Sequence, residues 1–272
     1  SMPLASRSRA ANSRTACSYR AAFFFVSGQN AATSVLSGRS WMTCLSVLSR
    51  RKIYGCTSDR SGPNRAPLAD FVEVKKKHGF QLLADEAHSF GVLGPQGRGL
   101  ADEAGVEDDI DFIVGTFSKS VGAIGGFGAG NHPLFETLRY AMRPYMFTAS
   151  SSPASIATSL AAIKKLAAEP ERRDRLRANS ARLFAGFKGL GLDMGCDMVS
   201  PVIAVKCADE VSTIAMWNAL LEAGVYVNIA LPPGTPNKLC LLRCSVSAAH
   251  SFDDIDKIIA LFGKVVASRA AA

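Results

Sequence analysis

A carboxylate and a lysine amine occur in this sequence in a pattern that suits one kind of chemistry. Asp85 opens the string Asp-Glu-Ala-His, which ends at His88, and Lys119 follows that histidine by 31 residues inside Gly-Thr-Phe-Ser-Lys-Ser-Val-Gly (residues 115–122). Pyridoxal phosphate (PLP) needs a lysine amine for a Schiff base and a carboxylate that keeps its ring nitrogen protonated, so that the ring can draw electrons from a carbanion. The pattern therefore predicts a PLP site that contains Asp85 and Lys119.

Two short apolar runs precede these residues and have the character of buried strands. Residues 80–84 end at Asp85, and residues 111–115 lead to Lys119. A loop rich in glycine and a short helical piece near residues 101–104 lie between them, which indicates strand, crossover and parallel strand. A third run at residues 123–128 predicts a strand beside the lysine loop. Open α/β sheets bind ligands at the carboxyl ends of their strands, where Asp85 and Lys119 would lie.

Each of these residues also has a purely structural interpretation. Asp85 could cap the next helix, and Lys119 could be a solvated charge, although its small and apolar neighbours suit a desolvated amine. His88 could be an ordinary loop histidine, but its spacing from Asp85 lets it reach the same ring. Thr116 could be a strand-end hydroxyl or could donate to a phosphate.

The string Asp-Glu-Ala-His also belongs to nucleic-acid helicases, which use it to hold magnesium and activate water. Such a motor needs a phosphate-binding loop of the form Gly-x-x-x-x-Gly-Lys-[Ser/Thr]. No segment of the 272 residues has that pattern. The sequence therefore disfavours a helicase, and we expect no nucleic acid partner.

Several further phrases match one enzyme family in order and spacing. They cover residues 83–89, 97–99, 115–120, 125–127, 131–133, 143–150 and 241–245. With them the chain resembles the α-oxoamine synthases, PLP enzymes of fold type I, and within that family the bacterial serine palmitoyltransferases. The resemblance runs from about residue 66 to residue 267, which is three quarters of this chain but roughly the C-terminal half of a family member.

The resemblance implies an α/β fold with an incomplete large parallel-sheet domain and a small C-terminal α+β domain. We expect an atypical basic segment at residues 1–65, the C-terminal part of the large PLP-binding domain at 66–155, and linking helices with the small domain at 156–272. Apolar periodicity predicts helices at residues 68–77, 155–166, 172–190, 211–223 and 252–267. Strands are predicted at residues 201–205, 225–228 and 239–246.

The resemblance also implies how the cofactor would be held. Lys119 would join PLP and later move the α-proton, while Asp85 would pair with the ring nitrogen. His88, in a catalytic as well as a binding role, would bond the phenolic oxygen of PLP. Thr116 would bond its phosphate, and Thr148 would reach the phosphate of a neighbouring subunit's cofactor, because family sites lie between the subunits of a homodimer.

The substrates implied are an amino acid, most readily L-serine, and a long-chain acyl-CoA. Arg243 would hold the substrate carboxylate as a bidentate pair. The products would be a 3-keto long-chain base, carbon dioxide and coenzyme A, as in sphingolipid biosynthesis. Phe117-Ser118 before the lysine favours this serine-using branch over the branches that carry Leu-Gly there.

Two departures from the family pattern support an alternative, a fragment or pseudo-enzyme with impaired cofactor binding. Leu231 stands where the bacterial serine palmitoyltransferases carry an arginine. The family's upstream phosphate segment and ring-stacking histidine are not recognisable, and all four histidines align to other positions.

Residues 1–65 differ in composition from the rest. They hold ten of the 31 basic residues and one of the 23 acidic residues, Asp59, so their charge is +9 and that of the remainder is −1. The segment could be a transit-like leader, a binding arm for acidic partners, or a frame-shifted or mis-joined stretch.

Cysteine spacing and hydropathy indicate the compartment. The seven cysteines are odd in number and form no Cys-x-x-Cys pair, which favours free thiols in a reducing compartment over a disulfide framework or a metal site. No apolar run approaches the ~20 residues of a transmembrane helix. We therefore expect a cytoplasmic protein with no metal.

Overall fold

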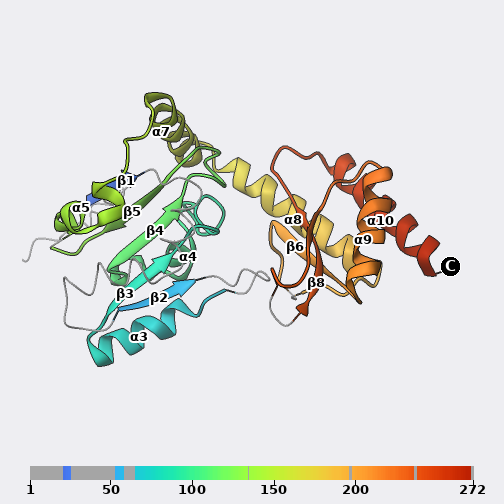
Figure 1. Cartoon of the computed structure of the whole chain (residues 1–272), viewed down its shortest axis with the longest axis horizontal. Coiled ribbons are helices and arrows are strands. Elements are labelled where there is room, and N and C mark those ends of the chain that lie inside the picture. Colours follow the sequence, from blue (N-terminus) through green and yellow to red (C-terminus); the bar gives the residue numbers. More distant parts are fainter. Residues whose placement is uncertain are drawn as a thin grey trace, which may run out of the picture.

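The computed structural model describes residues 21–25, 53–57, 65–133, 135–195, 198–235 and 238–270. Within these residues the chain forms two sheets, each with its own helices, joined through two long consecutive helices (Figure 1). Most of residues 1–65, and with them the three interpretations of this segment, lie outside the described residues. The described part includes two short strands that the sequence did not predict. These are β1 (Ala21–Phe25) and β2 (Ile53–Thr57).

The first sheet has the order β1-β5-β4-β3-β2 among the described strands. It contains β3 (Gln81–Asp85), β4 (Phe112–Thr116) and β5 (Gly126–Gly130). Strands β2, β3 and β4 are parallel, whereas β5 is antiparallel to β4 and β1 is antiparallel to β5. The predicted parallel pair is therefore confirmed.

The third predicted strand, at residues 123–128, was placed too early, because β5 begins only at Gly126. Residues 117–125 turn back instead: the Phe117 N–H donates to the Gly125 carbonyl at 2.9 Å, and the Ala123 N–H donates to the Phe117 carbonyl at 2.8 Å. These bonds close the connection between β4 and β5 into a compact turn.

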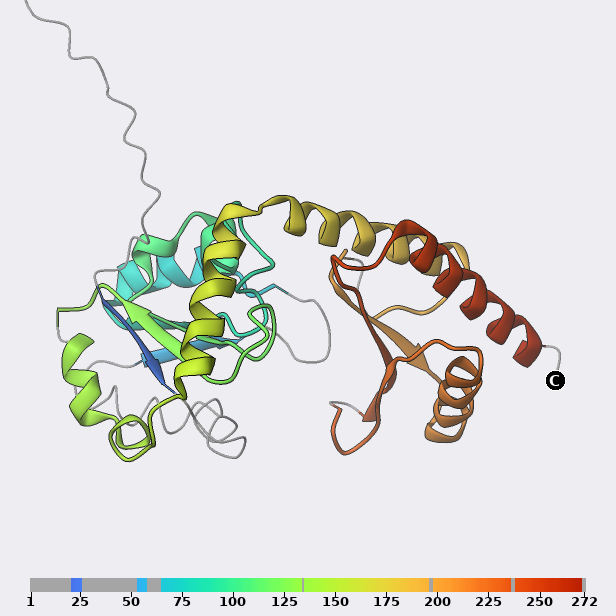
Figure 2. The same ribbon diagram turned by 90° about the horizontal axis from the view of Figure 1, so that it is seen from above.

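Helices cover the first sheet and complete its core. They are α3 (Leu68–His78), α4 (Leu100–Ala104), α5 (Leu138–Ala141), α6 (Arg143–Met146) and α7 (Pro153–Ala168), with 3-10 turns at Glu107–Asp109 and Phe135–Thr137. Figure 2 shows α7 lying across the sheet, and Ala162 and Ile163 of this helix pack against the buried cluster that contains Leu82, Ile113 and Phe127.

The basic end of α3 has a partner at the start of β4. Lys75 lies 2.8 Å from the Asp111 carboxylate, and the helix ends at Gly79, whose left-handed φ of 66° suits glycine. Positive charge in the last turn also suits the helix dipole. The sequence therefore predicted this helix and its end correctly.

The second sheet has the order β6-β8-β7 and is antiparallel throughout. It comprises β6 (Val202–Cys207), β7 (Asn228–Ala230) and β8 (Cys240–Ser245), and the helices α8 (Glu171–Gly189), α9 (Glu210–Glu222) and α10 (Phe252–Ala270) pack on it. Phe187 of α8 and Phe262 of α10 are both fully buried, and their ring centroids lie 4.5 Å apart. The four long helices predicted for residues 155–267 are confirmed.

One predicted strand of this half is wrong. Residues 225–228 were expected to form a strand, but only Asn228 belongs to β7. Val225 and Val227 are buried in the core as loop residues, and the Val227 carbonyl accepts a hydrogen bond from Trp217 Nε1 at 2.8 Å. The apolar alternation therefore reported burial of the side chains rather than pairing of the backbone.

The change from one core to the other falls between α7 and α8, at Glu169 and Pro170. Residues of α7 belong to the core of the first sheet, and Leu183 and Phe187 of α8 belong to the core of the second. Lys165 and Arg172 both pair with the Glu169 carboxylate across this break. The predicted domain boundary at residues 155 and 156 remains a prediction.

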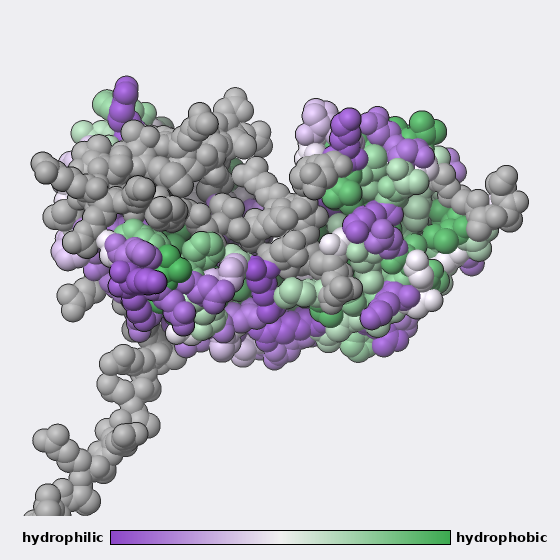
Figure 3. Space-filling view, turned by 90° about the horizontal axis from the view of Figure 1, so that it is seen from below, coloured by the Kyte–Doolittle hydropathy of each residue, from purple (hydrophilic) through white to green (hydrophobic). Residues whose placement is uncertain are grey.

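Cys240 and Cys244 are buried, as expected for strand residues, and with Cys207 they are free thiols. Burial raises the pKa of the Cys244 thiol to about 12. Figure 3 shows green apolar side chains gathered in several places on the half at the right of the view, which carries the second sheet.

The described residues contain no helix long and apolar enough to cross a bilayer. Among the same residues, no three or more His, Cys, Asp or Glu side chains lie together in a group that could hold a metal ion.

The aromatic contact between α8 and α10 should carry much of the stability of the second half. We expect Phe187→Ala to lower the free energy of unfolding by about 3–5 kcal/mol, because it removes a fully buried ring and leaves a cavity. Urea unfolding measures this loss. Val211→Ala, at a residue that is 79% exposed, is the control and should change stability by less than about 0.5 kcal/mol.

Candidate functional site

Asp85 is the last residue of β3, next to the parallel strand β4. The Ala87 N–H donates to Asp85 Oδ1 at 2.9 Å, and the Glu86 N–H donates to the Val114 carbonyl at 2.8 Å. The first bond orients the carboxylate, and the second continues the ladder between the strands by one residue. Asp85 is therefore held where the parallel strands end, as the sequence predicted.

Glu86 points the other way, into the protein, and is 1% exposed. Its carboxylate accepts hydrogen bonds from the Leu100 and Ala101 N–H groups at 2.8 Å each, and from the Ser89 hydroxyl. It thus caps the start of α4 from 14 residues away. Burial raises the pKa of this carboxyl above its usual range, although the three hydrogen bonds oppose the shift.

Lys119 lies in the turn between β4 and β5. The Gly122 N–H donates to the Lys119 carbonyl at 3.1 Å, and Phe117 anchors the turn because its buried ring stacks on Phe127 at 5.6 Å. The Lys119 side chain itself is exposed. The small neighbours form part of this turn, and the desolvated environment that they predicted for the Lys119 amine remains a prediction.

A direct contact joins the lysine turn to the loop after Asp85. The Ser120 hydroxyl donates to the Phe90 carbonyl at 2.7 Å. Gly91 follows with a φ of +82°, and a Cβ on it would lie 2.4 Å from the Ser120 side chain. The two loops therefore approach too closely for any residue but glycine at position 91.

Arg243 comes from the second sheet. It lies in β8 opposite Ala204 of β6, while its neighbours Leu242 and Cys244 are buried in the core. Because side chains alternate along a strand, Arg243 and Ser245 face away from that core. Arg243 is half-buried on this second face.

These residues meet at one cavity of about 850 Å³ that both halves line. The first half contributes Asp85, His88 and Lys119, and the second contributes Arg243. His88 is exposed at the edge of this space. Four of the six predicted site residues are thus brought together, although the sequence separation between Asp85 and Arg243 is 158 residues.

Thr116 and Thr148 do not line this cavity. Thr116 Oγ1 donates to the Gly125 carbonyl at 3.1 Å and lies 2.9 Å from Ser118 Oγ, so its hydroxyl closes the lysine turn. Thr148 is exposed after α6. The phosphate-binding roles of both threonines remain predictions.

The sequence analysis missed the residues that hold the site in place. These are Glu86, Ser120 and Gly91, together with Arg173 of α8, which is 6% exposed and also lines the cavity. Glu86 carried a weak signal, since an acidic residue directly after a buried strand needs partners. The other contacts join distant segments, and no local pattern marks them.

The profile of the family described as aminotransferase class I and II matches residues 61–262. The chain belongs to this family.

Relatives within the aminotransferase class I and II family are similar over the same region. Serine palmitoyltransferase of Caulobacter vibrioides is 52% identical over 203 residues, which are 75% of this chain and 50% of that protein. An 8-amino-7-oxononanoate synthase of Anaeromyxobacter sp. is 40% identical over 201 residues, 74% of this chain and 50% of that protein. Both relatives are α-oxoamine synthases, so the resemblance inferred from sequence is confirmed.

A solved structure extends this likeness to the fold. Serine palmitoyltransferase of Sphingomonas paucimobilis, with a bound PLP–myriocin aldimine, superimposes with a TM-score of 0.78 at 43% identity, over 82% of this chain and 56% of that one. The predicted fold-type-I α/β architecture is confirmed. This member of the aminotransferase family spans about half the length of the relatives it matches.

The close approach at Gly91 can be tested by adding a single methyl group. We expect Gly91→Ala to destabilise the protein by about 2–4 kcal/mol, because it adds a clash with Ser120 to the strain of a left-handed backbone. Thermal or urea unfolding measures the loss.

Gly105→Ala is the matched control, since Gly105 has a φ of +68° but nothing within 4 Å of its Cβ position. It should carry only the backbone cost of about 1–2 kcal/mol. Equal losses in the two variants would show that the contact with Ser120 does not constrain the loop.

The raised pKa of Glu86 predicts how stability changes with pH. The folded protein binds a proton on Glu86 more tightly than the unfolded chain does. The stability that this proton contributes is therefore complete below the unfolded pKa of 4.5, and it is lost as the pH rises through the higher pKa of the folded protein. Relative to Glu86→Gln, the wild type should lose stability from pH 4.5 upward, by at most about 1.4 kcal/mol per pH unit. Urea unfolding across this range measures the difference.

Glu73→Gln, at an exposed residue of α3, is the control and should run parallel to the wild type. Parallel curves for wild type and Glu86→Gln would contradict the buried-carboxyl explanation.

Proposed function

We propose that this chain binds PLP in the cavity between its two halves. The observation that carries the proposal is that a carboxylate, an imidazole, a lysine amine and a guanidinium line one space of about 850 Å³. That volume lies within the usual range of cofactor pockets, about 300–1,000 Å³. These four groups suit PLP: the carboxylate its ring nitrogen, the imidazole its phenolic oxygen, the amine its aldehyde carbon, and the guanidinium the carboxylate of the substrate.

Asp85 and Lys119 have the central roles in this proposal. Asp85, oriented by the Ala87 N–H, would hold a proton on the ring nitrogen. Lys119 would attach to the cofactor and afterwards remove or return the proton at the α-carbon of the substrate. When bound, PLP supplies the electron sink that makes loss of this proton feasible.

His88 and Arg243 would orient the cofactor and the substrate. His88, three residues after Asp85, would donate a hydrogen bond to the phenolic oxygen of PLP. Arg243 would pair with the carboxylate of the amino acid through two parallel N–H groups, which fixes the orientation of the α-carbon. Because Arg243 reaches the cavity from the second sheet, the spacing of the two halves sets where the substrate lies.

We propose that the reaction is a decarboxylating condensation of L-serine with a long-chain acyl-CoA. The deprotonated α-carbon would attack the thioester carbonyl, and the thiolate of coenzyme A would leave. The serine carboxylate would then depart as carbon dioxide, and the α-carbon, left with the electron pair, would take up a proton from Lys119. Phe117 and Ser118 before the lysine and the 52% identity to a serine palmitoyltransferase support serine as the amino acid. Because Leu231 replaces the arginine of the bacterial serine palmitoyltransferases, Arg243 is the cation that we propose for the serine carboxylate.

We also propose that the active form is a homodimer with shared sites. Thr148, assigned to the phosphate of the neighbouring subunit's cofactor, is exposed. Large apolar side chains close to it in sequence are exposed as well: Phe147 is 79% exposed and Tyr140 is 75% exposed. A second copy of the chain would remove this apolar surface from water.

A cytoplasmic location is part of the proposal. Cys207, Cys240 and Cys244 are free thiols in the structure, which suits a reducing compartment.

The visible absorption spectrum tests cofactor binding directly. The purified chain, mixed with PLP and then freed of excess cofactor, should keep a visible band that Lys119→Ala lacks, because the band comes from a Schiff base between PLP and the Lys119 amine. Lys76→Ala, at an exposed lysine of α3, is the matched control and should retain the band. Addition of serine should then change the spectrum, and release of coenzyme A thiol from palmitoyl-CoA should report the condensation.

The alternative is a member of the fold that does not retain the cofactor. The absence of a band in the wild type would favour that alternative. A band without thiol release would limit the function to binding PLP and the amino acid.

A further inference from the structure

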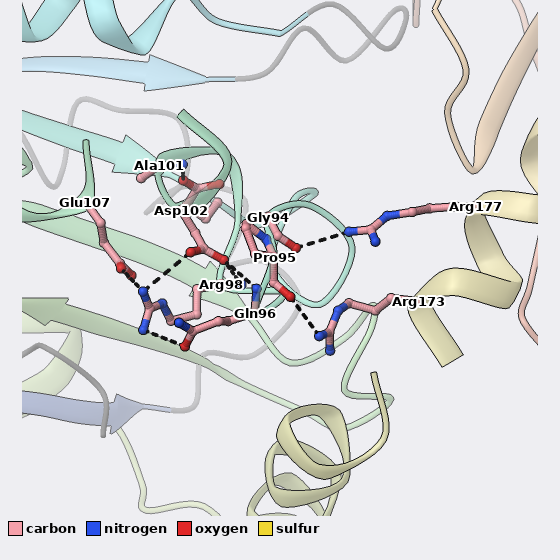
Figure 4. Close-up of polar contacts among 10 residues, drawn as sticks. Gly94, Pro95, Gln96, Arg98, Ala101, Asp102, Glu107, Arg173 and Arg177 are labelled. Atoms are coloured by element: carbon pink, nitrogen blue, oxygen red, sulfur yellow. Dashed lines mark hydrogen bonds and ion pairs between the residues drawn. The ribbon is translucent and has the colours of Figure 1, made fainter. Parts of the chain in front are cut away.

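Two arginines of α8 hold a loop of the first half by its backbone (Figure 4). Arg173, which is 6% exposed, donates from Nη2 to the Pro95 carbonyl at 3.1 Å and from Nη1 to the Leu166 carbonyl at 2.6 Å. Arg177 donates from Nη2 to the Gly94 carbonyl at 3.1 Å. The start of α8 is therefore fixed to the loop at residues 94–97 and to the end of α7.

The loop at residues 94–97, which the two arginines bind, is also held by hydrogen bonds from its other side. Asp102 Oδ2 accepts hydrogen bonds from the Gln96 N–H at 3.0 Å and the Arg98 N–H at 3.3 Å. The Arg98 guanidinium in turn lies 2.6 Å from the Glu107 carboxylate. Figure 4 shows these side chains converging on the loop from the side opposite to Arg173 and Arg177. Arg173 and Arg177 thus bind a loop whose conformation is already fixed by Asp102.

The same loop reaches the lysine turn. The Gly91 N–H donates to the Gly97 carbonyl at 2.8 Å, which ties the two ends of the loop together. Next to this bond, the Phe90 carbonyl accepts the Ser120 hydroxyl at 2.7 Å, and Ser120 directly follows Lys119. A shift of residues 94–97 would therefore be transmitted to the turn that carries the lysine.

The middle of α8 is fixed to the segment that directly follows β8, the strand that carries Arg243. Asn179, which is 3% exposed, donates from Nδ2 to the Ser247 carbonyl at 3.0 Å and to the His250 carbonyl at 2.8 Å. Ser247 lies two residues after the end of β8. With a rise of 1.5 Å per residue, Arg173 and Asn179 are about 9 Å apart along the helix axis.

We propose that Arg173 and Arg177 are positioning residues, which set the distance across the cavity between Lys119 and the substrate-binding Arg243. The path runs from Lys119 through Ser120 and the loop to α8, and from Asn179 to the end of β8. This inference rests on the proposed function, since it gives the amino acid carboxylate its place relative to the amine. Neither arginine needs to touch the substrate.

The two arginines differ in burial, so variants of them can separate an effect on the position of the loop from an effect on the stability of the fold. Arg173 is buried, so replacing it removes two hydrogen bonds from the interior. Arg177 is 52% exposed and also pairs with Asp174, so its replacement should leave the fold intact while it releases Gly94. Arg175 is exposed on the same helix and provides a matched control.

The first measurement is amide hydrogen exchange of the full chain without cofactor. The Gly97 N–H donates to the Gly94 carbonyl at 3.2 Å, and the Gly99 N–H donates to the Leu93 carbonyl at 3.1 Å. In Arg173→Met and Arg177→Met these two amides should exchange faster than in wild type, by about tenfold for Arg173→Met. Arg175→Met should match the wild type. Unchanged exchange in both Arg173→Met and Arg177→Met overturns the proposal, whatever the enzyme does.

The second measurement separates substrate binding from turnover. With the PLP band retained, Arg177→Met and Arg173→Lys should raise the KM for serine by about tenfold or less, with a smaller fall in kcat. Faster exchange with an unchanged serine KM would make the arginines structural only and overturn the proposal. A wild type without a PLP band would instead refute the proposed function, while the exchange data still decide whether the arginines hold the loop.

Discussion

The buried carboxylate of Glu86 is the constraint on which the first half of the site depends. Removing a charged group from water costs several kcal/mol unless hydrogen bonds replace the lost hydration. Here the replacement comes from Ser89, Leu100 and Ala101, so the loop after β3 has to return to its own beginning. That closed path places Asp85 at the strand end and brings the backbone of residues 90–97 within reach of the lysine turn and of α8.

The strands and helices could be predicted from the sequence wherever a local pattern determined them. The parallel pair β3 and β4, the long helices and the burial of Cys240 and Cys244 all follow from apolar periodicity. The errors arose where burial and backbone pairing diverge. Val225 and Val227 fill the core from a loop, and residues 123–125 belong to a turn whose shape depends on bonds to Phe117.

The chemical groups of the site were predictable, but the contacts that position them were not. Asp85, His88, Lys119 and Arg243 were identified by type, spacing and family resemblance, and the structure places all four on one cavity. Ser120, Gly91 and Arg173 have ordinary sequence surroundings, and their importance comes from partners 29 to 78 residues away. The small neighbours of Lys119, which suggested a desolvated amine, form a tight turn whose shape depends on hydrogen bonds that no local pattern marks.

The residues that would meet a ligand in the cavity are accessible to solvent, whereas the polar residues that hold the surrounding backbone are buried. Lys119 and His88 are exposed, and Arg243 is half-buried, whereas Glu86, Arg173 and Asn179 are more than nine-tenths buried. Groups that meet a ligand have to remain accessible, and their long side chains gain a defined geometry only if the backbone beneath them cannot move. The buried polar residues supply that rigidity, since each binds backbone groups from a different segment. Substitutions at the exposed set should therefore change chemistry with little effect on the fold, while those at the buried set should alter geometry at a distance from the cavity.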